Sequence, residues 1–598
     1  MSVYSQLLKI KVHQLFLIMA AIFGTLFAFI LPPFQAPDEQ VHFYKAYAIS
    51  KGQLLCSNAE SSYAGSYLPS NISDFVNSTD MTNTTRSIGT LDNASQYYPS
   101  DNNVFFEHYS SCVYNALPYL PQALGIFIGD IMNLNYIWIF YLGRLLNLLV
   151  YLLICFYSIK LIPRLKKVVF LLALMPMSLH QAASLSADGL TNALSLLLIC
   201  YVLNVVYKKE EYLNRKTLIT IAALSILVSL LKITYFPLSL VVFLIPISKY
   251  KKIKNYFIIN CSIVVLSMVS AVSWLLITRT MDIYVPVNTE IQLNSLIDDP
   301  LGYSSLLFKN IFNYDNLYLQ FIGILGWLSV PLPMIVYILY FLSFFVVIAI
   351  EGSKESESIT KGRVFSIIIS LSIFVIGYIL VETSLYLNWP QTSAVIVEGV
   401  QGRYFIPLVL LLFYGLFLLV PTCIKHSKLI ICIFVAFTLL ITSTKIISHY
   451  YFFGPRYQLL EPHNNHFIVD GILEDTELSQ SFEADEDNLR GVSLYISTFQ
   501  KQITTPYMFV LKKENDLSVI REVQLDVSKI SDNSYYDIMF EPIENSKGQK
   551  YSISLFPLEE NISTPITLQL SKANVYTDGE LNIKGIPYTE DIVFKLHY

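Results

Sequence analysis

The amino-acid sequence predicts a mainly α-helical, polytopic membrane protein with an all-β domain at its C-terminal end. Hydrophobic residues make up 54% of the 598 residues and charged residues only 14%, whereas a soluble protein carries about 25% charged residues. Apolar segments, each near the ~20 residues of one helical crossing, recur up to about residue 450 and then give way to short alternating strands. The net charge of −5 gives no reason to expect nucleic-acid binding.

Eleven apolar segments, counted along this sequence, are the candidate membrane spans. No small-residue cleavage motif follows the first of them before Gln35, so we expect a retained anchor rather than a signal peptide. Arg144 and Asn147 lie inside the second span, where a buried structural pair or a headgroup contact is the favoured interpretation. The predicted spans cover residues 12–31, 138–159, 166–184, 188–207, 216–232, 235–249, 255–278, 328–350, 364–385, 404–421 and 429–447.

Lysine and arginine residues recur in the loops after every second predicted span, which predicts that these loops and the N-terminus are cytoplasmic. This assignment holds only if residues 117–134 form an interfacial helix rather than a crossing. Two prolines and Asp130 within that segment favour the interfacial helix. The basic clusters are Lys9 and Lys11; Lys160, Arg164, Lys166 and Lys167; Lys208, Lys209, Arg215 and Lys216; Lys249, Lys251, Lys252 and Lys254; Lys354, Lys361 and Arg363; and Lys425 and Lys428.

The transmembrane domain, residues 1–450, then has two large extracytoplasmic loops, residues 33–116 and 279–327. Cys56 and Cys112 are the only two cysteines in the first loop. Outside the cytoplasm they are candidates for a disulfide, which would stabilise the fold by about 4 kcal/mol through loop closure. Two unpaired thiols are the alternative.

Residues 451–598 are predicted to form a separate extracytoplasmic domain. Segments such as V-S-L-Y-I-S-T-F and Y-S-I-S-L-F alternate between apolar and polar residues, and turns containing Asn, Asp or Gly divide them. Many short strands at this spacing are typical of a β-sandwich. The segment has no catalytic motif that we can identify, so an accessory or carbohydrate-contacting role rests on architecture alone.

The stretch P-P-F-Q-A-P-D-E-Q-V-H-F-Y, residues 32–44, directly follows the first span. Its prolines hold the approach extended, which makes Asp38 a good N-cap for the short segment that follows. Carboxylates are costly at the edge of the lipid, so Asp38 and Glu39, with His42 one helical turn later, point to a function. The alternative is a solvated turn with a capping aspartate.

Other polar residues fall at the same outer level. Asp188 opens the fourth span, and Lys232 lies in an outer hairpin with almost no loop, where a cation needs an anionic partner. The segment V-Q-G-R-Y supplies Gln401, Arg403 and Tyr404. Singly, Asp188 is explained as an N-cap, Lys232 by snorkelling and Arg403 by headgroup contact. Their convergence on one membrane face favours a site.

These residue types suit a phosphate attached to a lipid. Its tail would lie between helices and its charge at the interface, where Lys232 and Arg403 would hold it. Asp38 would act as general base on an acceptor hydroxyl while the cations stabilise the departing phosphate. Glu39 and His42 would bind either the sugar or, together with Asp38, a divalent cation such as Mg²⁺ or Mn²⁺, and the sequence does not decide between these roles.

Four motifs together resemble the bacterial membrane-protein family called domain of unknown function 2142. They are P-P-F-Q-A-P-D-E-Q-V-H-F-Y, L-M-P-M-S…A-S-L-S-A-D-G, K-I-T-Y-F-P-L and G-V-Q-G-R-Y-F-I-P, within about residues 10–450. The family is grouped with the GT-C glycosyltransferases, integral membrane enzymes that take sugars from polyprenyl-phosphate donors. The resemblance implies a GT-C helical core and a catalytic position for Asp38 and Glu39, with the choice of base left open. Lys232 and Arg403 match basic positions of the family's motifs, and their phosphate role is inferred from chemistry.

The leading hypothesis is a membrane glycosyltransferase that moves a sugar from a polyprenyl-phosphate-linked donor to a cell-envelope polysaccharide or glycolipid. It would work on the outer face of a bacterial cytoplasmic membrane, with the lipid-linked sugar, the envelope acceptor and membrane lipid as partners. The alternative is a non-enzymatic transporter or export component for envelope polysaccharide. A transporter places ionisable residues along a path through the bilayer, whereas here they gather on one side, which favours the enzyme.

Overall fold

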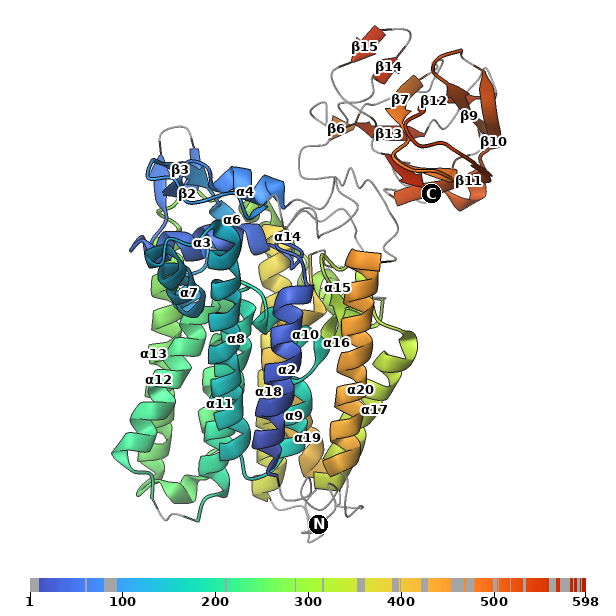
Figure 1. Cartoon of the computed structure of the whole chain (residues 1–598). Coiled ribbons are helices and arrows are strands. Elements are labelled where there is room, and N and C mark those ends of the chain that lie inside the picture. Colours follow the sequence, from blue (N-terminus) through green and yellow to red (C-terminus); the bar gives the residue numbers. More distant parts are fainter. Residues whose placement is uncertain are drawn as a thin grey trace, which may run out of the picture. The chain divides into compact units, whose positions relative to one another are not determined.

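The structure, a computed structural model of the whole chain (Figure 1), contains two compact units among its described residues. One unit is helical and lies within residues 10–448, and the other is built of β-strands and lies within residues 449–598. The described residues are 10–59, 62–79, 94–209, 212–285, 287–313, 317–351, 361–389, 397, 399–420, 428–452, 467–468, 478–497, 503, 505–516, 518–530, 534–558, 566–570, 581–583, 586–588, 592 and 594–598.

Within the described part of the chain, eight helices are long and apolar enough to cross a membrane. They run side by side through the helical unit (Figure 1) and correspond to eight of the eleven predicted spans. The α19 span includes the short 3₁₀ helix η4 that precedes it. These elements are α2 (Val12–Ile30), α8 (Tyr136–Leu161), α11 (Asp188–Tyr207), α13 (Ile253–Thr278), α17 (Met334–Glu351), α18 (Lys361–Asn388), η4 (Gly402–Phe405), α19 (Ile406–Leu419) and α20 (Lys428–Ile447).

The other three predicted spans do not form single long α-helices. Residues 166–184 divide into two short helices at Pro176, because proline has no N–H to continue the helical ladder. Residues 235–249 form 3₁₀ rather than α-helix, with Pro237 inside and Pro246 after the first piece. Residues 216–232 form a regular helix of 17 residues. The elements are α9 (Lys166–Ala173), α10 (Pro176–Ala182), α12 (Arg215–Leu231), η2 (Ile233–Leu244) and η3 (Ile247–Lys249).

Two of the segments predicted to be extracytoplasmic loops fold into compact structure at one end of the helical unit (Figure 1). Three antiparallel strands in the order β1-β2-β3 and several short helices surround an aromatic core in which Phe34, Phe43, Phe75 and Phe140 are in ring contact. The elements are α3 (Glu39–Ser50), β1 (Ser57–Ala59), β2 (Ser62–Pro69), α4 (Ile72–Ser78), β3 (Asn103–Glu107), α6 (Tyr109–Cys112), η1 (Leu117–Tyr119), α7 (Leu120–Ile131), α14 (Thr289–Asp298), α15 (Pro300–Asn313), α16 (Leu317–Ile322), β4 (Ile324–Leu325) and β5 (Val330–Pro331).

Helix α7 occupies the segment expected to be an interfacial helix. Its 12 residues extend about 18 Å, well short of the ~30 Å of a bilayer's hydrocarbon core. It packs closely on the start of α8, because a Cβ added at Gly125 would lie only 2.3 Å from the Leu142 carbonyl oxygen. A short helix held beside α8 agrees with an interfacial position rather than a crossing.

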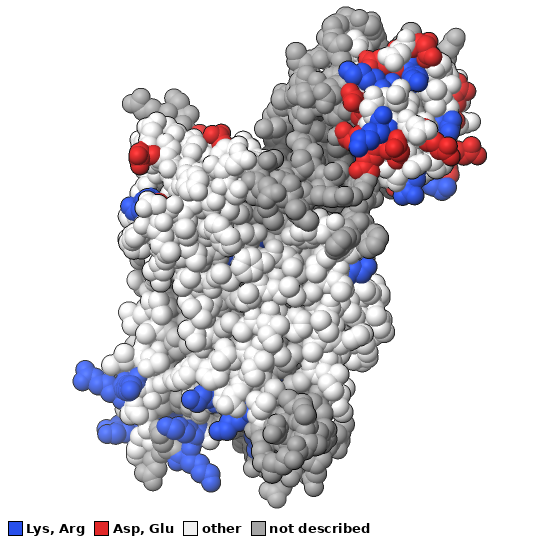
Figure 2. Space-filling view, in the orientation of Figure 1, with Lys and Arg blue, Asp and Glu red and all other residues white. Residues whose placement is uncertain are grey.

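The basic clusters gather at the other end of the helical unit. Figure 2 shows lysine and arginine concentrated where α12 and α13 begin. The loops at this end are tied together, since the Leu213 N–H donates to the Lys249 carbonyl and the Lys167 N–H to the Glu351 carboxylate. Of the clustered residues, Lys9, Lys354 and Lys425 lie outside the described residues. Which side of a membrane this end faces stays a prediction.

The second unit is β-rich, as the sequence predicts. One sheet has the strand order β10-β9-β12-β7-β14-β15 and the other β11-β8-β13-β6, with β16 also paired to β8. Phe482 and Phe509 from the first sheet share a core with Leu494 and Leu596 from the second. The elements are η5 (Ser448–Phe452), β6 (Phe467–Ile468), β7 (Leu478–Glu483), β8 (Leu489–Ser497), β9 (Tyr507–Lys513), β10 (Val519–Gln524), η6 (Val527–Lys529), β11 (Ser534–Ile543), β12 (Lys550–Pro557), β13 (Thr567–Leu570), β14 (Leu581–Ile583), β15 (Ile586–Tyr588) and β16 (Phe594–His597).

A disulfide joins Cys56 to Cys112 within the first of the predicted loops. The Lys45 ammonium group donates to Cys56 Sγ at 3.3 Å, and His108 Nδ1 lies 3.6 Å from Cys112 Sγ. Lys45 is fully buried although it is a lysine. Burial penalises the charged amine and lowers the pKa of Lys45 from its ordinary 10.5 to about 8.

The buried amine makes the stability of the helical unit depend on pH. Between pH 8 and 10.5 the unfolded chain binds more protons at Lys45 than the folded chain, so stability should rise with pH across this window, by up to about 3 kcal/mol. Thermal unfolding of the detergent-solubilised protein from pH 7.5 to 9.5 measures this rise. Lys45→Met should flatten the pH dependence, whereas Lys51→Met, which removes a 42% exposed lysine directly after the same helix, should retain it. Equal slopes in both variants would contradict the assignment.

Candidate functional site

A buried ion pair between Arg144 and Glu39 fixes the start of the acidic motif. Both side chains are completely buried, and the guanidinium binds the carboxylate twice, with Nε to Oε1 at 2.8 Å and Nη2 to Oε2 at 2.6 Å. The remaining N–H groups of Arg144 donate to the carbonyls of Ala28, Leu31 and Pro32. Glu39 Oε1 also accepts the Leu185 N–H at 3.0 Å. This pair joins α2, α3, α8 and the turn before α11.

The ion pair with Arg144 separates Glu39 from Asp38, although the sequence predicts a catalytic position for both. Glu39 is engaged through both carboxylate oxygens and has no exposed surface, which argues against it as the base or as a ligand of a metal or sugar. Asn147, one turn after Arg144, is also buried and donates to the Ser184 carbonyl at 2.8 Å. Arg144 and Asn147 therefore both have structural roles, but they bind different partners rather than each other.

Asp38 has the opposite environment. Its backbone is left-handed, with φ 61° and ψ 13°, and its side chain makes no capping hydrogen bond to α3, so the capping interpretation does not apply. The side chain is 52% exposed, and Oδ2 lies 3.4 Å from Arg403 Nη2. Phe34, four residues earlier, is left-handed as well. Non-glycine residues in this conformation cost about 1 kcal/mol or more and cluster at functional sites, with aspartate among the residues that tolerate it best.

Arg403 and Lys232 flank a second carboxylate. Asp188 Oδ1 lies 3.7 Å from Lys232 Nζ, and Asp188 Oδ2 lies 3.7 Å from Arg403 Nε. All three side chains are largely buried. Within the described part of the chain, Arg403 Nε and Gln401 Oε1 are buried polar atoms without a hydrogen-bond partner. We call Asp38, Asp188, Lys232 and Arg403 the charged cluster, and its contacts are looser than those of the Arg144 pair.

Local packing holds the cations of the charged cluster in place. A Cβ added at Gly402 would lie 2.1 Å from the Leu317 carbonyl oxygen, so only glycine lets η4 approach α16 this closely. The Tyr235 hydroxyl donates to the Tyr404 carbonyl at 2.7 Å. The Lys232 ammonium lies 4.1 Å from the centre of the Tyr404 ring, a cation–π contact. The Tyr404 ring therefore lies against the Lys232 ammonium.

His42 lies beside the charged cluster but is oriented by an aromatic residue. Its Nδ1 is 2.8 Å from the Tyr119 hydroxyl, and its ring is in contact with Tyr114. Burial lowers the pKa of His42, although Asp38 and Asp188 act in the opposite direction. The neutral form is therefore favoured at pH 7.

The three candidate metal ligands do not converge. Asp38 faces Arg403, Glu39 faces Arg144 and His42 faces Tyr119. Among the described residues, the group of potential ligands with mutually close donor atoms is instead Cys56, His108 and Cys112, and its two sulfurs are joined in the disulfide. The predicted Mg²⁺ or Mn²⁺ does not fit the three residues named for it.

Two contacts near the motif escaped sequence reasoning. The Trp327 indole donates to the Phe34 carbonyl at 2.9 Å, and the Gly326 N–H donates to His180 Nε2 at 3.3 Å. Both come from the turn between β4 and β5, in the second predicted loop. A tryptophan in a glycine-flanked turn next to an apolar run is the only signal that the sequence offers, and it does not specify a partner.

Residues 21–412 match a family of predicted membrane proteins designated DUF2142. The chain belongs to the DUF2142 family. The matched segment contains the Arg144 pair and the whole charged cluster, and it excludes α20 and the β unit. No curated protein matches the chain. The DUF2142 match itself describes a membrane protein and assigns no activity.

Loss of charge should destabilise this DUF2142 protein strongly at Glu39 and only slightly at the adjacent Asp38. Glu39→Gln leaves the Arg144 guanidinium buried without its counter-ion and should cost about 3–5 kcal/mol, seen as low yield or a lower melting temperature of the purified protein. Asp38→Asn should change stability by about 1 kcal/mol or less, because Asp38 is half exposed and asparagine tolerates the left-handed conformation. Equal destabilisation by both substitutions would contradict these roles.

Proposed function

We propose that the protein is a membrane glycosyltransferase that moves a sugar from a polyprenyl-phosphate-linked donor to a cell-envelope polysaccharide or glycolipid on the outer face of the membrane. The observation that carries the proposal is the charged cluster, in which two buried cations and a half-exposed carboxylate meet at one end of the helical unit. Membership of the membrane-protein family is consistent with a lipid-linked substrate.

The distances within the cluster support phosphate binding. Charge-assisted hydrogen bonds between nitrogen and oxygen are about 2.7–2.9 Å long, whereas Arg403 and Lys232 lie 3.4–3.7 Å from their carboxylates. Arg403 Nε, which is buried and has no hydrogen-bond partner within the described part of the chain, has a donor to offer to a phosphate oxygen. Buried cations act in a low dielectric, where they stabilise a departing phosphate more strongly than in water.

Asp38 is the carboxylate best suited to be the general base. It is 52% exposed, so an acceptor hydroxyl can reach it, while Asp188 lies between the two cations. In the proposed step the acceptor oxygen attacks the anomeric carbon and passes its proton to Asp38. The bond from that carbon to the phosphate oxygen breaks, and the phosphate leaves with the electron pair beside Lys232 and Arg403. The unpartnered Gln401 Oε1 is suited to accept a hydrogen bond from a sugar hydroxyl.

The first test is the envelope polysaccharide of a deletion strain complemented with different variants. Asp38→Asn should fail to restore the missing sugar despite normal expression, because the amide cannot accept the hydroxyl proton. Asp101→Asn, which removes an exposed carboxylate from the same loop, should restore it fully. Full restoration by Asp38→Asn would place the base elsewhere and favour the transport alternative.

Donor binding tests the two cations separately from the base. Lys232→Met and Arg403→Gln should each weaken binding of polyprenyl phosphate to the purified protein by about 10- to 100-fold, the value of one hydrogen bond to a charged group. Lys232→Arg should retain most of the affinity, which separates lost charge from misfolding. Lys309→Met removes an exposed lysine on α15 and should leave binding unchanged. Wild-type affinity in both loss-of-charge variants would remove the cations from the proposed site.

A further inference from the structure

Glu382 on α18 is a buried carboxyl inside a helix that is long and apolar enough to cross a membrane. Its side chain has no exposed surface. Asn310 Nδ2, from α15, donates to Glu382 Oε2 at 2.6 Å, and within the described part of the chain Glu382 takes part in no ion pair. A charged carboxylate in such surroundings is costly unless a cation or further donors compensate it.

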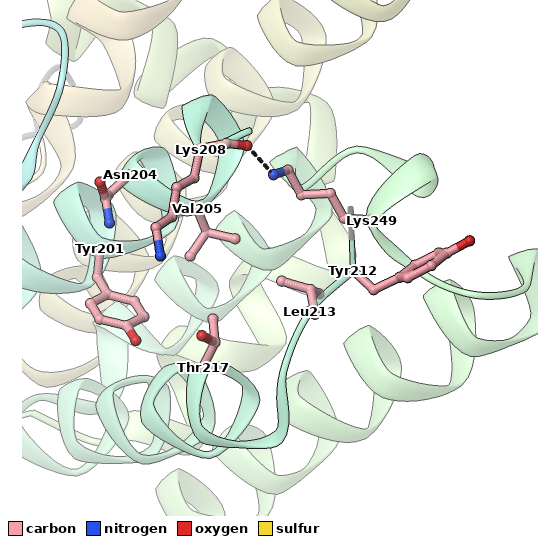
Figure 3. A pocket seen from close by; sticks show the side chains of 8 residues that line it. All are labelled: Tyr201, Asn204, Val205, Lys208, Tyr212, Leu213, Thr217 and Lys249. Atoms are coloured by element: carbon pink, nitrogen blue, oxygen red, sulfur yellow. Dashed lines mark hydrogen bonds between the residues drawn. The ribbon is translucent and has the colours of Figure 1, made fainter. Parts of the chain in front are cut away.

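A buried lysine at the basic end of the helical unit shows what such compensation looks like. Lys249 lines a pocket between α11 and α12, and its ammonium donates to the Lys208 carbonyl (Figure 3). The charge of Lys249 is thus met by an oxygen of the chain itself. Glu382 has one such contact, through Oε2, and its other oxygen has none among the described residues.

Two oxygens at the contact between α15 and α18 have no hydrogen bond. Glu382 Oε1 and Asn310 Oδ1 are both buried polar atoms without a hydrogen-bond partner in the described part of the chain. They belong to the two groups that Nδ2 and Oε2 already join. Since a charged carboxylate and an amide oxygen can only accept hydrogen bonds, neither can satisfy the other.

One proton on Glu382 would satisfy both oxygens. A carboxyl protonated at Oε1 becomes a donor, and Oδ1 of the same planar amide is the acceptor that lacks a donor. Together with the bond from Nδ2 to Oε2, the acid and the amide then form a closed pair of two hydrogen bonds. Turning the amide around would bring Oδ1 against Oε2, and two oxygens at that distance again require a proton between them.

The titratable neighbours of Glu382 are tyrosines rather than cations. The Tyr378 hydroxyl faces Glu382 but donates its proton to the Leu307 carbonyl at 3.1 Å, and the Tyr303 hydroxyl is bonded to the Thr383 hydroxyl. Lys309, next to Asn310, is exposed. Helices α14, α19 and η2 also pack on α18 and add no charge beside Glu382. Tyrosines are neutral at pH 7 and do not compensate a carboxylate; those around Glu382 are Tyr303 on α15, Tyr318 on α16, and Tyr378 and Tyr386 on α18.

We propose that Glu382 is a proton-binding site whose neutral carboxyl holds α15 against α18. The acid and the Asn310 amide form two hydrogen bonds to each other, and no cation is needed at this position. Loss of the proton leaves a buried charge and two acceptor oxygens opposite each other, so α15 loosens from α18 at Asn310. The site is separate from the charged cluster and does not depend on the proposed transfer reaction.

Infrared spectroscopy of the full-length protein in detergent tests for the proton directly, because a protonated carboxyl has a C=O band distinct from that of a carboxylate. At pH 7 the wild-type protein should show a band that Glu382→Gln removes. Glu290→Gln, which removes an exposed carboxylate from α14, should leave the band unchanged. Asn310→Leu should move the band to higher frequency, because it removes the hydrogen bond to the carboxyl. A spectrum that neither Glu382→Gln nor Asn310→Leu alters would overturn the proposal.

Hydrogen exchange in residues 300–313 tests the attachment of α15. Exchange in the wild-type protein should exceed that in Glu382→Gln at a pH high enough to abolish the carboxyl band, and the two should agree at pH 7, because glutamine pairs with Asn310 at every pH. Equal exchange at both pH values would overturn the coupling to α15. A melting temperature that rises with sodium chloride but not with choline chloride, in a protein without the band, would overturn the proton in favour of a bound cation.

Discussion

The Arg144 guanidinium is the constraint on which the end of the helical unit around α3 depends. Five hydrogen bonds from one side chain connect three carbonyls at the end of α2 with the carboxylate at the start of α3. Helix ends leave backbone carbonyls without partners, and a cation there is favoured by the helix dipole, as is a carboxylate at the start of the next helix. The turn from Pro32 to Asp38 is therefore fixed at both ends, and the left-handed conformation of Asp38 can be maintained.

The Arg144 pair and the charged cluster, which contain the adjacent residues Glu39 and Asp38, thus have different physical character. The Arg144 pair has contacts of 2.6–3.0 Å, no exposure and complete hydrogen bonding of the guanidinium, which suits a structural role. The charged cluster has contacts of 3.4–3.7 Å, a half-exposed aspartate and a buried arginine nitrogen that makes no hydrogen bond to the described residues. A grouping that is incompletely satisfied by the protein itself is the one suited to bind a ligand.

The sequence predicted the helical and β-rich parts of the fold because hydropathy and alternation are local properties. The sequence also predicted that Asp38, Asp188, Lys232 and Arg403 lie on one membrane face. This prediction was possible because counting the spans tells at which end of its helix each residue lies. The sequence could not separate Asp38 from Glu39, because the distinction depends on Arg144, 105 residues away. The break at Pro176 and the 3₁₀ geometry near Pro237 were likewise missed, because an apolar run hides local backbone geometry.

The pairing of charges within the cluster has a consequence for the proposed reaction. Two carboxylates and two cations leave the cluster nearly neutral, which limits the cost of burying Lys232 and Arg403. An incoming phosphate competes with the carboxylates for the same cations, and Asp38, being the more exposed, is the easier one to release from Arg403. Donor binding would thus free the proposed base at the moment when the leaving group is in place. In the proposed reaction the same competition would keep Asp38 paired with Arg403 until a donor arrives, which would couple donor binding to activation.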